Sequence, residues 1–290
     1  MAGTKIVAGL IAALLAGGCS RSRSTIVVGS KNFTEQLVLG EILAQQLERK
    51  LGQKVERKLN LGGTLLAHQA LVNGEIDLYP EYTGTALTAI LKLPPSSDAA
   101  GVLRGVRSAY ETRWHLEWLE PFGFNNSFAM VIHGEEARRG GIQTLSEAAR
   151  AKTDWVMGVG YEFLQRPDGF HGLVKSYGLR IKGQVKTMDL GLLYRALEQG
   201  QVDMIAASAT DGMLSVLDVK VLDDDKHYFP PYEAAPVVRA DASSRHPGMR
   251  EALNELAGKL TDRAMQKLNY QLDGKHRPLA EVAREFLDGR

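Results

Sequence analysis

One pattern occurs twice along the chain and limits the folds that the chain can adopt. The segments ALVNGEIDLYPEYTGT (70–85) and ALEQGQVDMIAASATDG (196–212) share Ala-Leu-x-x-Gly-x-(Ile/Val)-Asp at identical spacing. In each segment a helical stretch stops at a glycine, and an apolar run typical of a strand follows. Unrelated helix–glycine–strand units can resemble each other by chance, but the shared spacing favours two similar α/β lobes.

Strand-like and helical patterns also alternate outside this repeat. TIVVGS (25–30) reads as a buried strand, and apolar positions within 38–47 then recur at helical spacing until Gly52. The same order begins again at KVERKLNL (54–61), and a second unit starts at DWVMGVG (154–160). This alternation predicts sheets that are covered by helices.

Two segments rich in proline, glycine and aromatic residues, 120–130 and 227–238, are suited to connect the lobes. If the chain crosses at both, lobe I comprises 25–126 and 232–290, and lobe II comprises 127–231. Open α/β sheets bind ligands beyond the carboxyl ends of their strands. We therefore expect a ligand-binding cleft between the lobes.

The first 19 residues have the features of an export signal. Lys5 supplies a small basic region, and a short apolar stretch leads to Gly-Gly-Cys19. Cys19 is the only cysteine, so it cannot form an internal disulfide, and its position resembles the lipobox of bacterial lipoproteins. We expect a signal peptide over 1–19 and a lipid anchor on Cys19, which makes the protein periplasmic or membrane-anchored. Ala16 stands where a lipobox has leucine, so cleavage to a freely soluble protein remains an alternative.

Composition and motifs argue against several function classes. The formal net charge is +1 and the only basic cluster is SRSR, so nothing favours a nucleic-acid partner. The sequence has no Gly-x-Ser-x-Gly elbow, no phosphate-binding loop, no Cys-x-x-Cys and no histidine pair at metal-binding spacing. We expect no enzyme, no cofactor and no metal. A carboxylate pair of Glu81 and Asp211 across the cleft is the one, weak argument for an enzyme.

Two cations and a hydroxyl are predicted at helix N-termini that follow strands. Lys31 precedes a helix whose start is marked by Asn32 and Glu35, a pair with capping-box spacing. Thr85 lies in the first turn of the next such helix, and Arg166 lies in the matching loop of lobe II. Each alone could be a solvated or structural side chain. Together they suit the binding of a carboxylate.

Three aromatic residues from separate segments are expected to meet in the same cleft. Tyr82 ends a strand of lobe I, and Phe128 and Tyr232 come from the two crossing segments. Rings around a quaternary ammonium attract it by cation–π interaction. Phe128 could instead pack in the core, and Tyr232 could stiffen a hinge. Rings together with a carboxylate clamp describe a receptor for a zwitterion.

Six motifs carry a resemblance to a known family: GSKNFTEQ, LGGT, GEIDLYPEYTGT, GFNNSFAM, ATDG and PPYEAAPVVR. In this order they resemble the substrate-binding proteins of osmoprotectant (glycine betaine/choline) ABC transporters, over nearly the whole mature chain. The resemblance implies a type II periplasmic-binding-protein fold with two α/β lobes joined by two crossover segments. It also implies a monomer that delivers a betaine-like solute to an ABC permease.

The resemblance assigns roles to individual residues. The family's carboxylate ligands match Lys31, Thr85 and Arg166. Its aromatic cation box matches Tyr82, Phe128 and Tyr232. Further residues that could line the cleft are Asn126, Asp211 and Glu81.

One departure from the family pattern bears on the ligand. The box normally has a fourth aromatic residue where this chain has Ser208, the counterpart of Tyr82 in the repeated pattern. The missing ring leaves space for a ligand larger than glycine betaine, such as carnitine or ergothioneine. A same-fold receptor for an unmethylated amino acid or another small carboxylate is the alternative.

Overall fold

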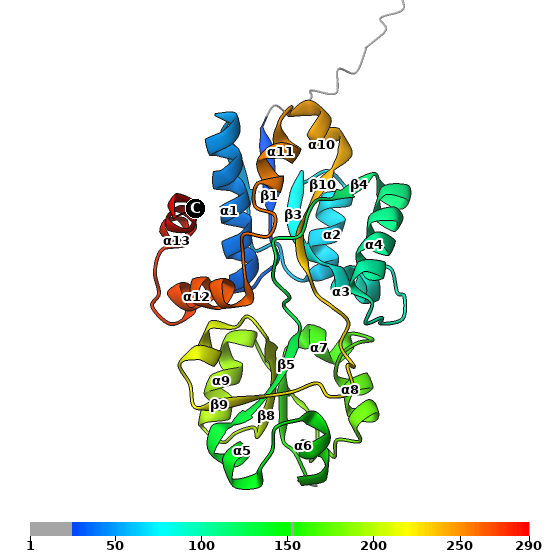
Figure 1. Cartoon of the computed structure of the whole chain (residues 1–290), viewed down its shortest axis with the longest axis vertical. Helices are drawn as coiled ribbons and strands as arrows, with labels where there is room; N and C mark the ends of the chain where they lie inside the picture. The colour runs from blue at the N-terminus through cyan, green and yellow to red at the C-terminus, as the bar shows by residue number, and fades with distance from the viewer. Residues whose placement is uncertain (1–24, 152–153, 290) are drawn as a thin grey trace, which may run out of the picture.

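The computed structural model describes residues 25–151 and 154–289, which form two lobes stacked along the long axis of the molecule (Figure 1). Each lobe contains a five-stranded sheet with helices against it. The predicted signal peptide and Cys19 lie outside the described residues. No helix within the described ranges combines the length and apolar character needed to cross a membrane.

The sheet of lobe I has the strand order β2-β1-β3-β10-β4. Its first three strands are parallel, and β10 pairs antiparallel with both β3 and β4. The strands are β1 (Ile26–Gly29), β2 (Val55–Lys58), β3 (Leu78–Tyr82), β4 (Leu116–Trp118) and β10 (Ala234–Arg239).

Helices cover both faces of this sheet. The predicted first helix is α1 (Thr34–Leu51), which buries its apolar face in the core and ends where Gly52 takes a left-handed conformation with φ of 63°. The others are α2 (Thr64–Val72), α3 (Thr83–Thr85), the π-helix η1 (Ala86–Ile90), α4 (Ala99–Trp114), α10 (Ala240–Arg245), α11 (Met249–Asn254), α12 (Asp262–Asp273) and α13 (Leu279–Asp288). Helices α11, α12 and α13 pack against α1.

The sheet of lobe II has the order β7-β6-β8-β5-β9. Its strands are β5 (Phe128–His133), β6 (Met157–Val159), β7 (Lys186–Thr187), β8 (Met204–Ser208) and β9 (Val219–Leu222). Its helices are α5 (Gly134–Gly140), α6 (Leu145–Ala151), α7 (Tyr161–Gln165), α8 (Phe170–Tyr177), α9 (Leu190–Glu198) and the 3-10 helix η2 (Gly212–Ser215).

The repeated pattern has the same structural role in both lobes. The Asp77 carboxylate accepts a hydrogen bond from the backbone N–H of Val27 at 2.8 Å, and the Asp203 carboxylate accepts one from that of Val156 at 2.9 Å. Asp77 directly precedes β3 and binds the start of β1, and Asp203 directly precedes β8 and binds the residue before β6. Each aspartate therefore links two neighbouring parallel strands where they begin. The prediction of two similar α/β lobes is confirmed.

The chain crosses between the sheets twice, from β4 to β5 and from β9 to β10. The crossing segments pair with each other through an antiparallel bridge between Asn125 and Glu233 and a 3.1 Å bond from the Asn126 N–H to the Tyr232 carbonyl. The predicted lobe limits fall within these connections. Helix α12 of lobe I also contacts η2 of lobe II. The lobes are therefore joined by the two crossing segments and by this helix contact.

Candidate ligand-binding site

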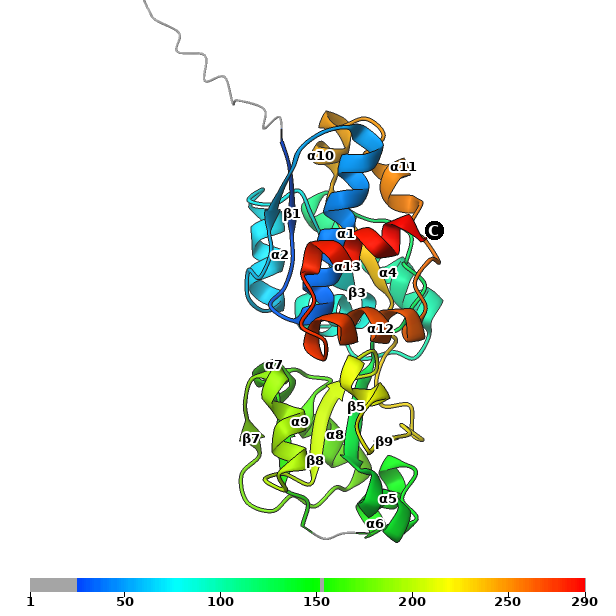
Figure 2. The same cartoon turned by 90° about the vertical axis from the view of Figure 1, so that its left-hand side faces the viewer.

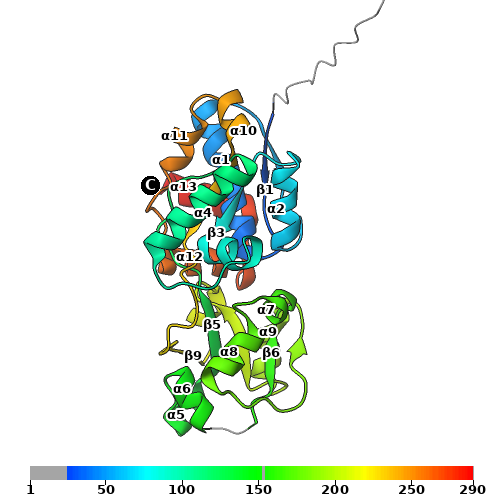
Figure 3. The same cartoon turned by 90° about the vertical axis from the view of Figure 1, so that its right-hand side faces the viewer.

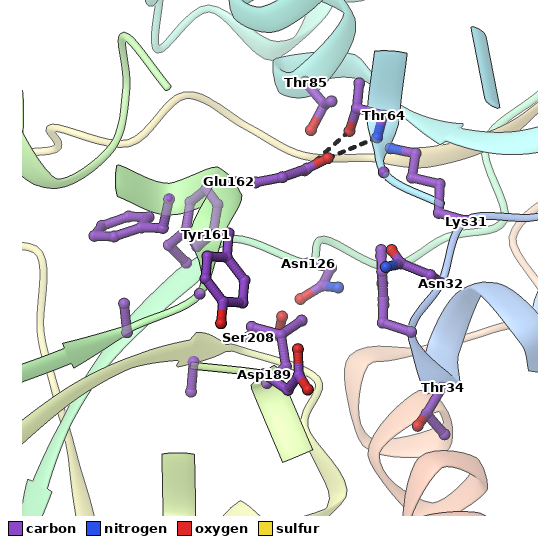
Figure 4. A pocket seen from close by; sticks show the side chains of 18 of the residues that line it. Lys31, Asn32, Thr34, Thr64, Thr85, Asn126, Tyr161, Glu162, Asp189 and Ser208 are labelled. Atoms are coloured by element: carbon purple, nitrogen blue, oxygen red, sulfur yellow. Dashed lines mark hydrogen bonds between the residues drawn. The ribbon is translucent and has the colours of Figure 1, made fainter. Parts of the chain in front are cut away.

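A cavity of about 620 Å³ lies between the lobes, where the carboxyl ends of β1 and β3 face those of β6 and β8. Figure 4 shows Lys31, Thr64 and Thr85 on one side of it and Ser208 and Asp189 on the other. The structure brings eight of the ten predicted site residues to its wall: Lys31, Tyr82, Thr85, Asn126, Phe128, Arg166, Ser208 and Tyr232. Glu81 and Asp211 do not line it.

The three predicted rings share the cavity with others that the sequence reasoning missed. Phe128 lies perpendicular to Tyr232 with ring centroids 5.6 Å apart, and 4.7 Å from Phe163 of α7. Phe33 stacks on Tyr82 at 6.3 Å. Phe33 and Phe163 each lie four residues after the end of a strand, β1 and β6 respectively, so their position beyond a strand end was the signal that could have found them. The aromatic wall is therefore larger than predicted.

Protein cations already lie near these rings. The Lys31 ammonium is 5.1 Å from the Tyr82 centroid, and the Arg166 guanidinium carbon is 5.3 Å from Phe128 and 5.7 Å from Tyr232. A cation within about 6 Å of a ring centroid is attracted by the electron-rich face. The rings thus stand at distances from which they can attract positive charge.

Lys31 forms a buried ion pair with Glu81. Their Nζ and Oε1 atoms are 2.5 Å apart, and both side chains are almost fully buried. The Glu81 carboxylate also accepts bonds from the Tyr79 hydroxyl at 2.9 Å and the Tyr82 backbone N–H at 2.7 Å. Glu81 is therefore the counter-ion of Lys31, and the expectation that it could line the cleft is wrong. An ammonium has three donors, so Lys31 retains hydrogens for a ligand.

Arg166 is also paired, and it joins the lobes. It donates to both carboxylate oxygens of Asp168, at 2.9 and 2.6 Å. From lobe II it also reaches the hydroxyls of Thr85 at 3.2 Å and Thr88 at 3.1 Å in lobe I. Asp168 is fully buried and additionally accepts from Thr88 and from the hydroxyl of Tyr232. Both predicted carboxylate-binding cations therefore have carboxylate partners within the protein.

Two further carboxylates, those of Glu162 and Asp189, line the cavity. Glu162 accepts bonds from Thr64. Asp189 is the N-cap residue of α9, yet its side chain makes no capping bond. These anionic groups add negative potential to a wall whose cations are paired, which favours a ligand with a positive end.

The capping box predicted for α1 is wrong. The helix begins after Phe33, which has no side-chain capping bond, and Glu35 is buried. The Glu35 carboxylate instead accepts from four side chains: Tyr82, Asn126, Thr210 and Asn269. Burial raises the pKa of Glu35, against the smaller opposite effect of these bonds. Glu35 thus links lobe I to a crossing segment and to Thr210 of lobe II.

Asp211 is held by a hydrogen bond from the backbone and does not line the cavity. It caps η2, and its carboxylate accepts from the Met213 N–H at 3.0 Å. Burial raises its pKa to about 6. Because neither Glu81 nor Asp211 lines the cavity, the carboxylate pair considered for an enzyme is not formed there. Among the described residues, no group of three or more His, Cys, Asp or Glu side chains could hold a metal ion.

Ser208 ends β8 and lies opposite Phe128 in the register of β5 and β8. It lines the cavity together with Ala206, Ala207 and Gly160, which are also small. The wall around Ser208 therefore consists of small residues, and the ring of Tyr161 and the side chain of Leu190 line the cavity from the same lobe.

A family model described as the substrate-binding domain of an ABC-type glycine betaine transport system matches residues 24–289. The chain belongs to this family. Members are substrate-binding receptors of transporters rather than a class of enzymes, and the predicted resemblance is confirmed.

Three relatives bear names that specify different solutes. A carnitine transport binding protein of Listeria monocytogenes is 34% identical over 92% of this chain and 87% of its own length. A glycine-betaine-binding protein of Pseudomonas aeruginosa is 37% identical over 95% of this chain and 91% of its own. An ergothioneine transport permease/ergothioneine binding protein of Helicobacter pylori is 35% identical, over 91% of this chain but 47% of that longer protein.

The fold is similar to that of a solved structure with related sequence. A crystal structure of a glycine betaine/carnitine/choline ABC transporter protein superposes with a TM-score of 0.77 at 32% identity, and covers 91% of this chain and 98% of that one. The predicted periplasmic-binding-protein fold is confirmed.

Proposed function

We propose that the chain is the extracytoplasmic solute receptor of an ABC importer and that it binds a quaternary-ammonium zwitterion. The observation that carries the proposal is the convergence of Tyr82, Phe128 and Tyr232 on one cavity between the lobes, in a member of the glycine betaine receptor family. A quaternary ammonium has no N–H to donate, so ring faces are the groups best suited to recognise it. The Asp189 carboxylate on the lobe II side adds attraction for the same end.

The carboxylate end of the ligand is assigned to Lys31, Thr85 and Arg166. Both cations keep N–H groups beyond those used by Glu81 and Asp168, and Thr85 places its hydroxyl beside the guanidinium. Because Arg166 belongs to lobe II and the other two to lobe I, a carboxylate bound here would favour the closed arrangement of the lobes. The receptor would then present the solute to its membrane permease.

Ser208, which replaces an aromatic ring of the family's cation box, determines how large a ligand the site accepts. The small wall around it admits glycine betaine but leaves room for carnitine or ergothioneine, which are the solutes named for two of the relatives. The missing ring also supports the alternative, a receptor for an unmethylated amino acid or another small carboxylate.

Ser208→Tyr tests this assignment. A ring at this position should strengthen glycine betaine binding about tenfold, by adding one cation–π contact, and weaken carnitine binding by filling the space. Titration calorimetry of both ligands measures the preference. Ser208→Ala is the control, because it removes the hydroxyl without adding a ring. An unchanged preference in Ser208→Tyr would mean that Ser208 does not contact the ligand.

Export and anchoring are part of the proposal. Cys19, which lies outside the described residues, is assigned as the lipid-bearing N-terminus of a monomeric receptor. Cys19→Ser should release the protein from membranes while it still binds its ligand, because the binding residues lie in the folded lobes. Membrane fractionation checks this. Wild-type protein recovered in the soluble fraction without a lipid on its N-terminal peptide would contradict it.

A further inference from the structure

We propose that Glu162 and the turn Gly62-Gly63-Thr64 form a latch that holds the mouth of the cavity closed. Glu162 belongs to α7 of lobe II, and Thr64 is the first residue of α2 in lobe I. The Thr64 backbone N–H donates to Glu162 Oε1 at 2.6 Å, and its hydroxyl donates to Oε2 at 3.2 Å (Figure 4). A carboxylate at a helix N-terminus is further stabilised by the free N–H groups and the helix dipole.

Gly63 makes this contact sterically possible. A Cβ at this position would lie under 3.0 Å from Glu162 Oε1, closer than side chains tolerate. The backbone of Gly63, with φ of −74° and ψ of −177°, is one that any residue can adopt. A side chain at this position would therefore displace the carboxylate of Glu162, although the backbone itself would accept it. This gives the second glycine of the LGGT motif a role.

The latch lies on the open side of the site. Gly63, Thr64 and Glu162 all line the cavity, and the neighbouring Tyr161 is 59% exposed. Figures 2 and 3 both place α2 directly above α7, at the edge of the molecule away from the crossing segments. When two lobes rotate about a hinge, the edge opposite the hinge separates most. A bond at this edge is therefore lost early in opening, and a bound solute cannot leave until it breaks.

The latch should slow the release of a bound solute, and this consequence rests on the proposed receptor function. The closed state gains stability from a contact that the protein makes with itself, so closure does not depend on the ligand alone. Loss of the latch should speed dissociation and leave association nearly unchanged, because the open state that admits ligand does not contain the contact.

Two variants remove the latch by different routes. Glu162→Ala deletes the acceptor from an exposed position. Gly63→Ala alters no polar group, but its methyl must displace the flexible end of Glu162. Gly191→Ala is the matched control, since it adds the same methyl to a glycine that lines the same cavity, where nothing lies within 4 Å of a Cβ.

The first measurement needs no ligand. Because Cys19 is the only cysteine, the full chain with Cys19→Ser can carry spin labels on Gln69→Cys of α2 and Glu198→Cys of α9, which are both exposed. Pulsed electron paramagnetic resonance gives the distance between the lobes. We expect a short distance for the parent and for Gly191→Ala, and a longer one for Glu162→Ala and Gly63→Ala. Identical distances in all four proteins overturn the latch.

The second measurement is the dissociation rate of glycine betaine and of carnitine by displacement in stopped flow. Both latch variants should release ligand about fivefold faster, as expected for one charge-assisted contact at an exposed site. The association rate should stay within about twofold of the parent for Gly63→Ala, which keeps the charge of Glu162. Unchanged rates in both variants contradict the proposal. If neither solute binds the parent, the proposed function fails, while the distances still decide whether the latch exists.

Discussion

Arg166→Ala should lower the free energy of unfolding by about 3–5 kcal/mol, because it leaves the buried Asp168 carboxylate without its cation. The pair is bidentate, and the Asp168 side chain has no exposed surface, so solvent cannot replace the guanidinium. The same substitution removes the contacts to Thr85 and Thr88 that join the lobes, so ligand binding should be lost as well. Urea unfolding and calorimetry measure the two effects.

A second substitution separates the charge from the packing. Adding Asp168→Asn to Arg166→Ala removes the unpaired charge, so the double variant should recover about half of the lost stability. It should not recover ligand binding, since the guanidinium is still absent. A loss below about 1 kcal/mol for Arg166→Ala alone would show that Asp168 is not held as the structure describes.

Glu35→Gln should destabilise the protein by about 1–3 kcal/mol at pH 7, because an amide nitrogen cannot accept the bonds that the carboxylate receives. The donors come from four separate segments, so the loss should also loosen the link between the lobes. Glu48→Gln is the matched control on the same helix. Its partner is Arg57 near the surface, so it should cost less than about 1 kcal/mol.

The destabilisation by Glu35→Gln should also depend on pH. Burial raises the pKa of Glu35 above its ordinary value of 4.5, so the folded state holds this proton more tightly than the unfolded chain. Wild-type stability relative to Glu35→Gln should therefore rise as the pH falls through the raised pKa towards 4.5. Asp211, whose pKa burial raises to about 6, is present in both proteins, so its effect largely cancels. A difference that stays constant or shrinks would contradict this assignment.

The sequence predicted the elements that follow from local patterns. The repeated Ala-Leu-x-x-Gly-x-(Ile/Val)-Asp predicted a helix, a turn and a strand in each lobe, and the residues at the ends of these strands, Tyr82 and Ser208, line the cavity. Strand ends are predictable because parallel strands that enter a sheet in the same direction finish at the same edge.

The partners of the charged residues could not be predicted in the same way. Glu81 lies within a strand and turns its carboxylate to Lys31, which is 50 residues away, and Glu35 binds donors from as far as Asn269. Such pairs depend on strand register and on how the C-terminal helices return to α1, which no local pattern encodes. The prediction of a helix cap from Asn32 and Glu35 was based only on residues close in sequence, so it missed the distant partners of Glu35.

Titration calorimetry of the wild-type protein with glycine betaine, carnitine and glycine shows whether the cavity recognises the methylated nitrogen. Glycine and glycine betaine differ only in the three methyl groups on nitrogen. Ring faces offer the N–H groups of glycine no oxygen acceptor in exchange for the water they lose, whereas the methylated cation has no N–H to satisfy and contacts the ring faces. A site for quaternary ammonium should bind glycine betaine or carnitine at least about a hundredfold more tightly than glycine. Glycine binding as tightly as the methylated compounds would contradict this assignment.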